Sequence, residues 1–173
     1  VPDGYEGVFE ADAGVVHAAA AVRAFQDRAE RNGARLHFEE PMLTWSADDR
    51  GVTVTTPAGS LSAGSLVVTV GAWTARLLAP LALPLVPHRV VNASFVPLTP
   101  ELFDPAHLPA FIVADDENLF YGLPAMPDEG VKVGAGGAPT DPDHVDRSVS
   151  EQEVAVLREA LDRFVPEASG PLA

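Results

Sequence analysis

The stretch ENLFYGLPAMPDEGVKVGAGG, residues 117–137, decides how the second half of the chain is interpreted. Two short β-patterned runs, Leu119–Leu123 and Val131–Val133, flank a turn rich in Pro, Asp, Glu and Gly, which is typical of a β-hairpin with a longer loop. Tyr121 and Lys132 are therefore expected on neighbouring strands. Because side chains alternate between the two faces of a strand, burial of the two valines that flank Lys132 sends its ammonium to the other face.

The composition restricts the classes of function. The chain has 173 residues, 47% of them hydrophobic, which suffices for the core of one domain or of two incomplete ones. Its 25 acidic and 11 basic residues give a net charge of −14, so nucleic acid and membrane surfaces are not expected partners. No apolar run approaches the roughly 20 residues that cross a bilayer, and no signal peptide is recognised. A cytoplasmic protein is expected, and the lack of cysteine excludes disulfides and thiolate chemistry.

The N-terminal part of the chain shows a β-helix-β pattern. A strand is predicted over Gly7–Glu10, a helix over Ala18–Asn32 and a second strand over Ala34–Phe38, which together predict a right-handed crossover in a parallel sheet. Gly33 follows the helix at the position where glycine commonly ends one. The helix is expected to dock through an apolar stripe made of Ala18, Val22, Phe25 and Ala29.

The next segment predicts a small antiparallel meander and a buried strand. The meander comprises Met42–Ser46, Val52–Thr56 and Ser60–Leu61, which alternate apolar with polar residues around Gly-containing turns. Leu66–Val70 is a nearly continuous apolar run, typical of a strand that is buried on both faces. A short helix is predicted over Thr74–Ala79.

Proline density changes the character of the chain at residues 80–109. Such density favours edges, bends and loops, so we expect a crossing between domains and divide the chain into residues 1–80 and 81–173. In the second part, strands are predicted over Val86–Val96 and Phe111–Ala114 in addition to the hairpin.

A final helix is predicted from its capping signals. The Ser150 hydroxyl can cap the first turn while the Glu153 side chain reaches back to the Ser150 backbone, and Pro166 ends the helix. Its apolar stripe is Val154, Leu157, Leu161 and Phe164.

Motifs for nucleotide, metal or hydrolytic chemistry are absent from the sequence. There is no G-x-G-x-x-G, P-loop, H-E-x-x-H or G-x-S-x-G motif. The five histidines show no pair at metal-ligand spacing. Asp115–Glu117 and Asp141–Asp146 lack the ligand rhythm of a calcium loop and are interpreted as solvated turns. No metal site is predicted.

A set of short motifs carries a resemblance in its order and spacing. The motifs are Val8-Phe9-Glu10 to Gly14, the alanine-rich helix, Gly33-Ala34, Val70-Gly71-Ala72-Trp73, Phe120-Tyr121-Gly122-Leu123-Pro124 and Val131-Lys132-Val133-Gly134. Together they span nearly the whole chain. In this order they resemble the flavoprotein amine oxidases of the monomeric sarcosine oxidase and N-methyltryptophan oxidase type, within the D-amino-acid oxidase family.

The resemblance implies an α+β (mixed α/β) fold. Residues 1–80 would be the middle segment of an FAD-binding β-α-β domain, and residues 81–173 part of a substrate domain with an antiparallel sheet and helices on one side. Both domains would be incomplete, so the chain is expected to be an internal piece of a longer oxidase. Because the dinucleotide fingerprint is missing, FAD is expected in the longer protein and not in this piece, which would then be inactive.

Cofactor contacts are carried over from the family residue by residue. The resemblance places Met42 where the family lays backbone groups against the adenine end of FAD. It also places Gly71, Ala72 and Trp73 at a turn that packs beside the cofactor, where glycine permits close backbone approach.

Catalytic and substrate-pocket residues follow in the same way. Lys132 matches the lysine near the flavin ring that assists the reaction with oxygen, and Tyr121 matches a tyrosine that lines the substrate pocket. Ile112, Leu123 and Gly136 would line that pocket. The last two depart from sarcosine oxidases, which have an aromatic residue in place of Leu123 and a carboxylate-binding histidine in place of Gly136. A wider, less polar pocket follows, which favours a bulkier secondary amine or cyclic amino acid over sarcosine.

Other interpretations of these residues stay open at this point. Lys132 could guard an edge strand against aggregation, Tyr121 could be an ordinary half-buried strand residue, and Trp73 could belong to the core. The chain could also be a non-catalytic binding or interaction domain that retains the substrate-domain sheet. Exposed faces of the incomplete domain are expected to pair with another copy of the chain.

Overall fold

The computed structural model describes residues 3–114 and 119–173 and divides the chain into two compact units. One unit is Val16–Val86, and the other combines Val1–Val15 with Pro87–Ala173. The break after Val86 falls a few residues beyond the predicted boundary at residues 80 and 81, whereas residues 1–15, which the sequence assigns to the first part, group with the second. The assignment of the two parts to a flavin domain and a substrate domain stays a prediction.

The second unit contains a four-stranded antiparallel sheet, as predicted. Its strand order is β4-β7-β6-β5, so the central strands β6 and β7 are the two arms of the hairpin from which the sequence was interpreted. A β-bulge between Leu123 and Met126 adds an irregularity to their register. The strands are β4 (Val91–Phe95), β5 (Phe111–Ala114), β6 (Leu119–Met126) and β7 (Gly130–Ala135).

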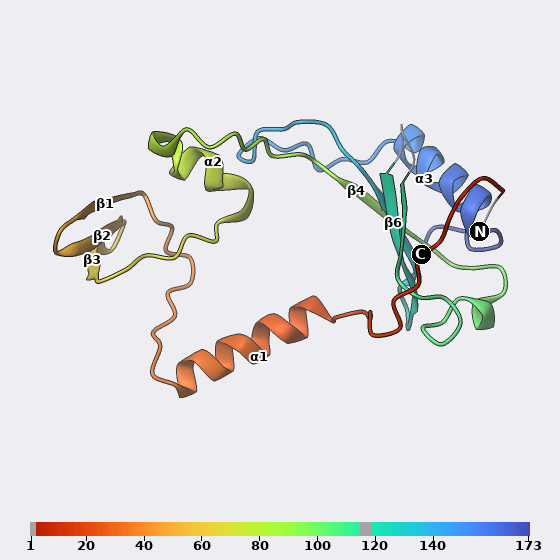
Figure 1. Ribbon diagram of the computed structural model, residues 1–173, viewed down its shortest axis with the longest axis horizontal. Helices are drawn as coiled ribbons and strands as arrows, with labels where there is room; N and C mark the ends of the chain where they lie inside the picture. The colour runs from red at the N-terminus through yellow and green to blue at the C-terminus, as the bar shows by residue number, and fades with distance from the viewer. Residues whose placement is uncertain (1–2, 115–118) are drawn as a thin grey trace. The chain divides into compact units, whose positions relative to one another are not determined.

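Helix α3 (Glu151–Phe164) covers one face of this sheet (Figure 1). The alternating residues Phe95, Val131 and Val133 are fully buried and form a core with Leu157 and Leu161 of the helix. Burial of such side chains stabilises each by about 1.5–3 kcal/mol relative to exposure. This core fixes which side of each strand faces the helix.

The predicted cap of α3 is present. The Ser150 hydroxyl accepts a hydrogen bond from the Glu153 backbone, and the Glu153 carboxylate accepts one from the Ser150 backbone. Arg89, which lies before β4, donates through Nη1 to Glu153 at 2.5 Å and through Nε to the Asp146 carbonyl at 2.6 Å. One side chain thus ties the segment before β4 to the start of α3.

The first unit contains the predicted meander. Strand β2 (Gly51–Thr56) pairs antiparallel with β1 (Thr44–Asp48) and with β3 (Gly59–Ala63). The Trp45 indole nitrogen donates to the Leu77 carbonyl at 3.1 Å, which connects the meander to the short helix α2 (Thr74–Leu77). That helix lies between two 3₁₀ turns, η1 (Gly71–Trp73) and η2 (Ala79–Leu81).

The predicted parallel β-helix-β unit is wrong. Helix α1 (Ala18–Arg31) forms, but none of its residues is buried, and Val22 and Phe25 of its stripe are 53% and 75% exposed. Gly7–Glu10 and Ala34–Phe38 contain no strand. A strand exists only where a neighbour supplies hydrogen bonds, and within residues 3–114 and 119–173 no strand pairs with either segment.

Two further strand predictions fail in the same way. Leu66–Val70 forms no strand and is partly exposed, with Val67 83% accessible to solvent, so it is not buried on both faces. The long strand predicted over Val86–Val96 shortens to β4, preceded by an isolated bridge between His88 and Pro139. The mixed α/β class and the antiparallel sheets are confirmed, whereas the β-α-β crossover does not form.

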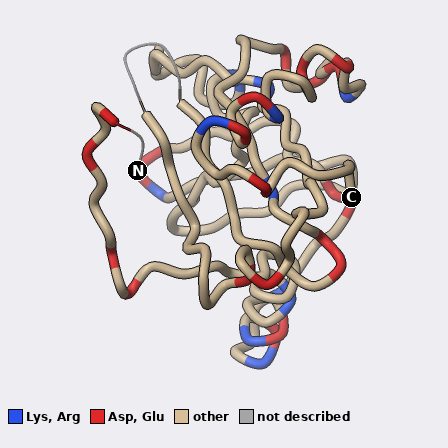
Figure 2. The backbone as a smooth tube through the Cα atoms, turned by 90° about the vertical axis from the view of Figure 1, so that its right-hand side faces the viewer, with Lys and Arg blue, Asp and Glu red and all other residues tan. Residues whose placement is uncertain are grey.

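The acidic residues of the chain lie on many of its loops and turns. Figure 2 shows Asp and Glu residues along many loops and turns of the chain. In the described part of the chain, no helix is long and apolar enough to cross a membrane. The predicted acidic turn at Asp115–Glu117 lies outside the described residues.

The contact between Arg89 and Glu153 predicts an acid-sensitive contribution to stability. The hydrogen bond from Arg89, with others from Ser150, lowers the pKa of Glu153 from 4.5 to about 2. A carboxyl group whose pKa is lowered on folding contributes fully above its unfolded pKa, and the contribution is lost as pH falls through the folded pKa. We expect Glu153→Gln to lower the melting temperature at about pH 7, and the difference from wild type to shrink between about pH 5 and pH 2, measured by circular dichroism.

Glu151→Gln is the matched control for this prediction. It removes a carboxylate from the same helical turn that is not a partner of Arg89, and it should lower the melting temperature less. A difference between Glu153→Gln and wild type that stays constant down to about pH 2 would contradict the prediction.

Candidate active site

The register of the sheet gathers four predicted site residues on one face. Lys132 lies opposite Leu123, and Tyr121 lies opposite Ile112. Each alternates with residues that pack beneath α3, so these four side chains project from the other face of the sheet. We call it the Lys132 face; it consists of Asn92, Ser94, Ile112, Tyr121, Leu123, Lys132 and Gly134.

Lys132 occupies an interior strand. It lies on β7 between Ser94 of β4 and Leu123 of β6, and its side chain is half-buried. Among the residues that the structure describes, no carboxylate lies within ion-pair distance of its amino group. Because β7 has a neighbour on each side, Lys132 does not guard a sheet edge, and that alternative interpretation is wrong.

Tyr121 reaches across the sheet to Asn92, which lies outside the sequence motifs that carry the family resemblance. Its hydroxyl donates a hydrogen bond to Asn92 Oδ1 at 2.9 Å, although β6 and β4 are separated by β7. Gly134 lies between them, and a Cβ atom there would be 2.2 Å from Asn92 Oδ1 and 2.6 Å from the Tyr121 hydroxyl oxygen. The missing side chain of Gly134 therefore makes room for the contact. The alternation in the β4 sequence VNASF is the signal from which the orientation of Asn92, away from the core, could have been predicted.

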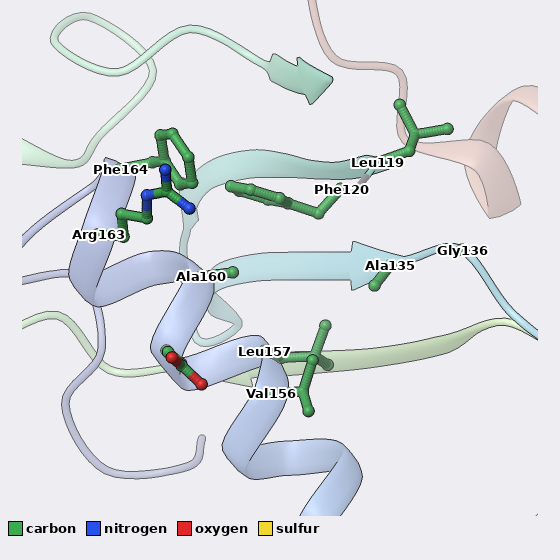
Figure 3. A pocket seen from close by; sticks show the side chains of 10 residues that line it. Leu119, Phe120, Ala135, Gly136, Val156, Leu157, Ala160, Arg163 and Phe164 are labelled. Carbon is green, nitrogen blue, oxygen red and sulfur yellow. The ribbon is translucent and has the colours of Figure 1, made fainter. Parts of the chain in front are cut away.

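Gly136 does not join this group. It follows β7 and lines a cavity of about 570 Å³ on the opposite side of the sheet, between α3 and the ends of β6 and β7 (Figure 3). Apolar side chains, among them Phe120, Leu157 and Phe164, make up most of its wall, with Arg163 at one end. The structure thus separates Gly136 from Lys132 and Tyr121.

The residues expected to contact FAD lie in the first unit. Gly71 begins the 3₁₀ turn η1 with φ +55°, a left-handed conformation that suits glycine, and nothing would lie within 4 Å of a Cβ atom there. Ala72 and Trp73 complete the turn, and Trp73 is 42% exposed, so it is not a core residue of its unit. Met42 is half-buried just before β1. These residues stay predicted cofactor contacts.

Three of the five histidines contact nearby acids, and His37 does so with Glu40 at 2.7 Å. His107 and His144 contact Asp104 and Asp141, three residues earlier in each case, at 2.8 and 2.9 Å. The hydrogen bond from His107 lowers the pKa of Asp104. Among residues 3–114 and 119–173, no group of three or more His, Asp and Glu side chains could hold a metal ion.

Comparison with known proteins identifies the family. A family model described as DAO, FAD dependent oxidoreductase, matches residues 1–173. The chain belongs to this family of FAD-dependent oxidoreductases. It is 34% identical to a monomeric sarcosine oxidase from Bacillus sp. (strain NS-129) over 99% of its own length and 46% of that protein, so it spans about half the length of this curated relative.

Other relatives agree with this assignment. A monomeric sarcosine oxidase from Streptomyces avermitilis is 36% identical over 94% of the chain and 44% of its own length. An N-methyl-L-tryptophan oxidase from Yersinia pestis is 35% identical over 74% of the chain and 34% of its own length. These two relatives bear out the resemblance drawn from the sequence motifs.

Solved structures share the fold. NikD, described as an unusual amino acid oxidase essential for nikkomycin biosynthesis, superposes with a TM-score of 0.61 at 23% identity and covers 86% of this chain and 40% of its own. A glycine oxidase from Geobacillus kaustophilus superposes with a TM-score of 0.58 at 23% identity, covering 84% of this chain and 37% of its own. At such identities the likeness concerns the fold alone.

The residues present fit one part of the family cofactor. The isoalloxazine ring of FAD is flat, and the Lys132 face offers a cation at Lys132 and apolar side chains at Leu123 and Ile112. The pyrophosphate of FAD normally binds at a glycine-rich helix N-terminus, and this sequence contains no such motif. The chain therefore offers side chains suited to the ring end of the cofactor and lacks the motif for its phosphates.

The glycine between Tyr121 and Asn92 supplies a stability test. Gly134→Ala would place a methyl group in the space that the ends of the Tyr121 and Asn92 side chains fill, so the two side chains would move apart and lose their hydrogen bond, which is worth about 0.5–1.5 kcal/mol. We expect the free energy of unfolding, measured with urea, to fall by this amount. Gly136→Ala is the matched control, because the nearest atom to its Cβ would be the Leu119 carbonyl oxygen at 4.0 Å. Equal losses in the two variants would contradict the close contact at Gly134.

Proposed function

We propose that the complete protein to which this chain belongs is a flavin-dependent oxidase of secondary amines or amino acids. The observation that carries the proposal is the position of Lys132 and Tyr121 on interior strands of one sheet, with both side chains on the face away from α3. Family membership and the shared fold support it. Relatives named as sarcosine and N-methyl-L-tryptophan oxidases suggest the substrate class.

Lys132 would act as a fixed cation beside the reacting atoms. Bound FAD would supply the redox chemistry, which is acceptance of a hydride equivalent from the C–H next to the amine nitrogen and its return to oxygen as hydrogen peroxide. Lys132 sits on the central strand β7 and is half-buried, so its ammonium is held in place and its field is less screened than that of a surface lysine. A preorganised charge of this kind stabilises negative charge that develops on oxygen.

The apolar residues of the Lys132 face would shape the substrate pocket. Leu123 takes the place of an aromatic residue of sarcosine oxidases, and this change widens the pocket. Gly136, which lines the cavity on the opposite side of the sheet, takes no part in it. The wider pocket favours a bulkier secondary amine or a cyclic amino acid over sarcosine, and the oxidised product would be an imine that water hydrolyses.

By itself, the 173-residue chain would be inactive, since it carries no phosphate-binding motif for FAD. The exposed apolar side chains of α1 would then associate with a second copy of the chain, because Val22 and Phe25 place apolar surface in water. The alternative is a non-catalytic binding domain. In that case Lys132 would have no role in flavin reoxidation in the complete protein.

Substitution of Lys132 tests the oxidase directly. In the complete flavoprotein, Lys132→Met should slow reoxidation of the reduced flavin by oxygen by about 10²-fold, the usual cost of removing one preorganised charge or donor. Stopped-flow absorbance measures this rate. Lys132→Arg keeps the positive charge but spreads it over a planar guanidinium, so it should lose less of the rate than Lys132→Met. An unchanged rate in Lys132→Met would remove the proposed role.

Behaviour of the 173-residue chain in solution gives a second test. We expect no FAD to remain bound after gel filtration, and sedimentation to show dimers or larger species. Phe25→Glu should shift the chain towards monomer, because it places a charge within the apolar stripe. Ala24→Glu, an exposed position on the other side of the same helix, should not. A yellow chain after gel filtration, or a monomer at all concentrations, would count against this picture.

A further inference from the structure

The hydrogen bond between Tyr121 and Asn92 determines what each group has left to offer. A tyrosine hydroxyl has one proton and two acceptor lone pairs, and the Tyr121 proton is given to Asn92 Oδ1 at 2.9 Å. The phenolic oxygen therefore presents acceptor capacity to the Lys132 face. It is suited to receive a hydrogen bond from the N–H of an amine.

The amide of Asn92 has hydrogen-bond donors that remain available. Its oxygen accepts from Tyr121, while its NH₂ group retains two donors. Within residues 3–114 and 119–173, no protein group accepts a hydrogen bond from that nitrogen, and Asn92 is exposed. Two donors on one nitrogen suit a carboxylate oxygen.

The surroundings favour a carboxylate over a neutral acceptor. Asn92 and Tyr121 flank Gly134 in one row across the sheet, and Lys132 lies two residues away on the same strand and the same face. Within residues 3–114 and 119–173 the Lys132 ammonium has no carboxylate partner, so its charge attracts an anion to this row. The row thus presents an acceptor at Tyr121 and donors at Asn92, with a positive charge nearby.

We propose that Asn92 and Tyr121 form a recognition pair for an amino acid, in which Tyr121 accepts from the substrate amine and Asn92 donates to the substrate carboxylate. This inference rests on the proposed oxidase function and makes its substrate class narrower, an amino acid and not a simple amine. Asn92 then takes the carboxylate contact that Gly136 cannot make. The side chain of Asn92 becomes a determinant of specificity that the sequence motifs did not contain.

Three ligands with the same branched carbon centre separate the two contacts. α-Aminoisobutyrate carries both an amine and a carboxylate, pivalate only the carboxylate, and tert-butylamine only the amine. None has a C–H next to an amine nitrogen, so none can be oxidised and binding is measured without turnover. Calorimetric titration of the complete flavoprotein with each ligand gives the dissociation constants.

Substitutions at the two positions should affect different ligands. Asn92→Val should raise the dissociation constants of α-aminoisobutyrate and pivalate about tenfold, the value of a hydrogen bond to a charged group at a partly exposed site. The dissociation constant of tert-butylamine should change by less than about twofold. Asn92→Asp keeps an acceptor for Tyr121 but places a negative charge there. It should therefore weaken the binding of pivalate more than Asn92→Val does, and it should not weaken the binding of tert-butylamine. Tyr121→Phe should weaken the binding of tert-butylamine and α-aminoisobutyrate more than the binding of pivalate, because it removes the amine contact and only releases the orientation of the Asn92 amide.

Controls separate this inference from the function on which it rests. Thr99→Ala removes another side-chain hydrogen bond of the same unit, to Glu167, and should leave all three ligands unaffected. If the protein holds FAD and Lys132→Met slows reoxidation, but Asn92→Val binds pivalate as wild type does, the recognition pair is overturned and the oxidase stands. If wild-type protein holds no FAD and binds none of the ligands, both the oxidase and the pair are overturned.

Discussion

Burial of one side of a four-stranded sheet beneath α3 is the constraint on which the candidate site depends. Phe95, Val131 and Val133 must point towards Leu157 and Leu161, because their removal from water supplies the stability of the unit. Because side chains alternate along a strand, the residues next to these three in sequence must then point to the opposite face of the sheet. Lys132 and Tyr121 are held on the opposite side by the same packing that forms the core. A polar site is thereby positioned by contacts that contain no polar atom.

The parts of this fold that sequence predicted are those whose signals are local. The hairpin was recognised from its alternation and turn residues, and α3 from Ser150 and Glu153. The predictions that were wrong are of strands that need a neighbouring strand to pair with. Leu66–Val70 has the composition of a buried parallel strand, but composition does not supply the neighbouring strands that would make it one, and no strand in the described part of the chain pairs with it.

The candidate site likewise contains residues that local sequence could predict and residues that depend on long-range pairing. The sequence placed Lys132 and Tyr121 on adjacent strands because a turn joins them. It did not bring in Asn92, since that contact depends on the register of β4 against β7, which are far apart in the chain, and on the absence of a side chain at Gly134. It also grouped Gly136 with Lys132, whereas the chain leaves the sheet after Ala135 and Gly136 lines the cavity beneath α3.

The division of the chain into two compact units also separates its chromophores. Both tryptophans, Trp45 and Trp73, belong to Val16–Val86, while both tyrosines, Tyr5 and Tyr121, belong to the other unit. Indole fluorescence excited beyond the tyrosine absorption band thus reports on one unit alone. Tyrosine ultraviolet signals report on the other, and Tyr121 sits beside Lys132. The native sequence therefore carries an optical label for each half of the molecule, with which the unfolding of each can be followed without added dyes.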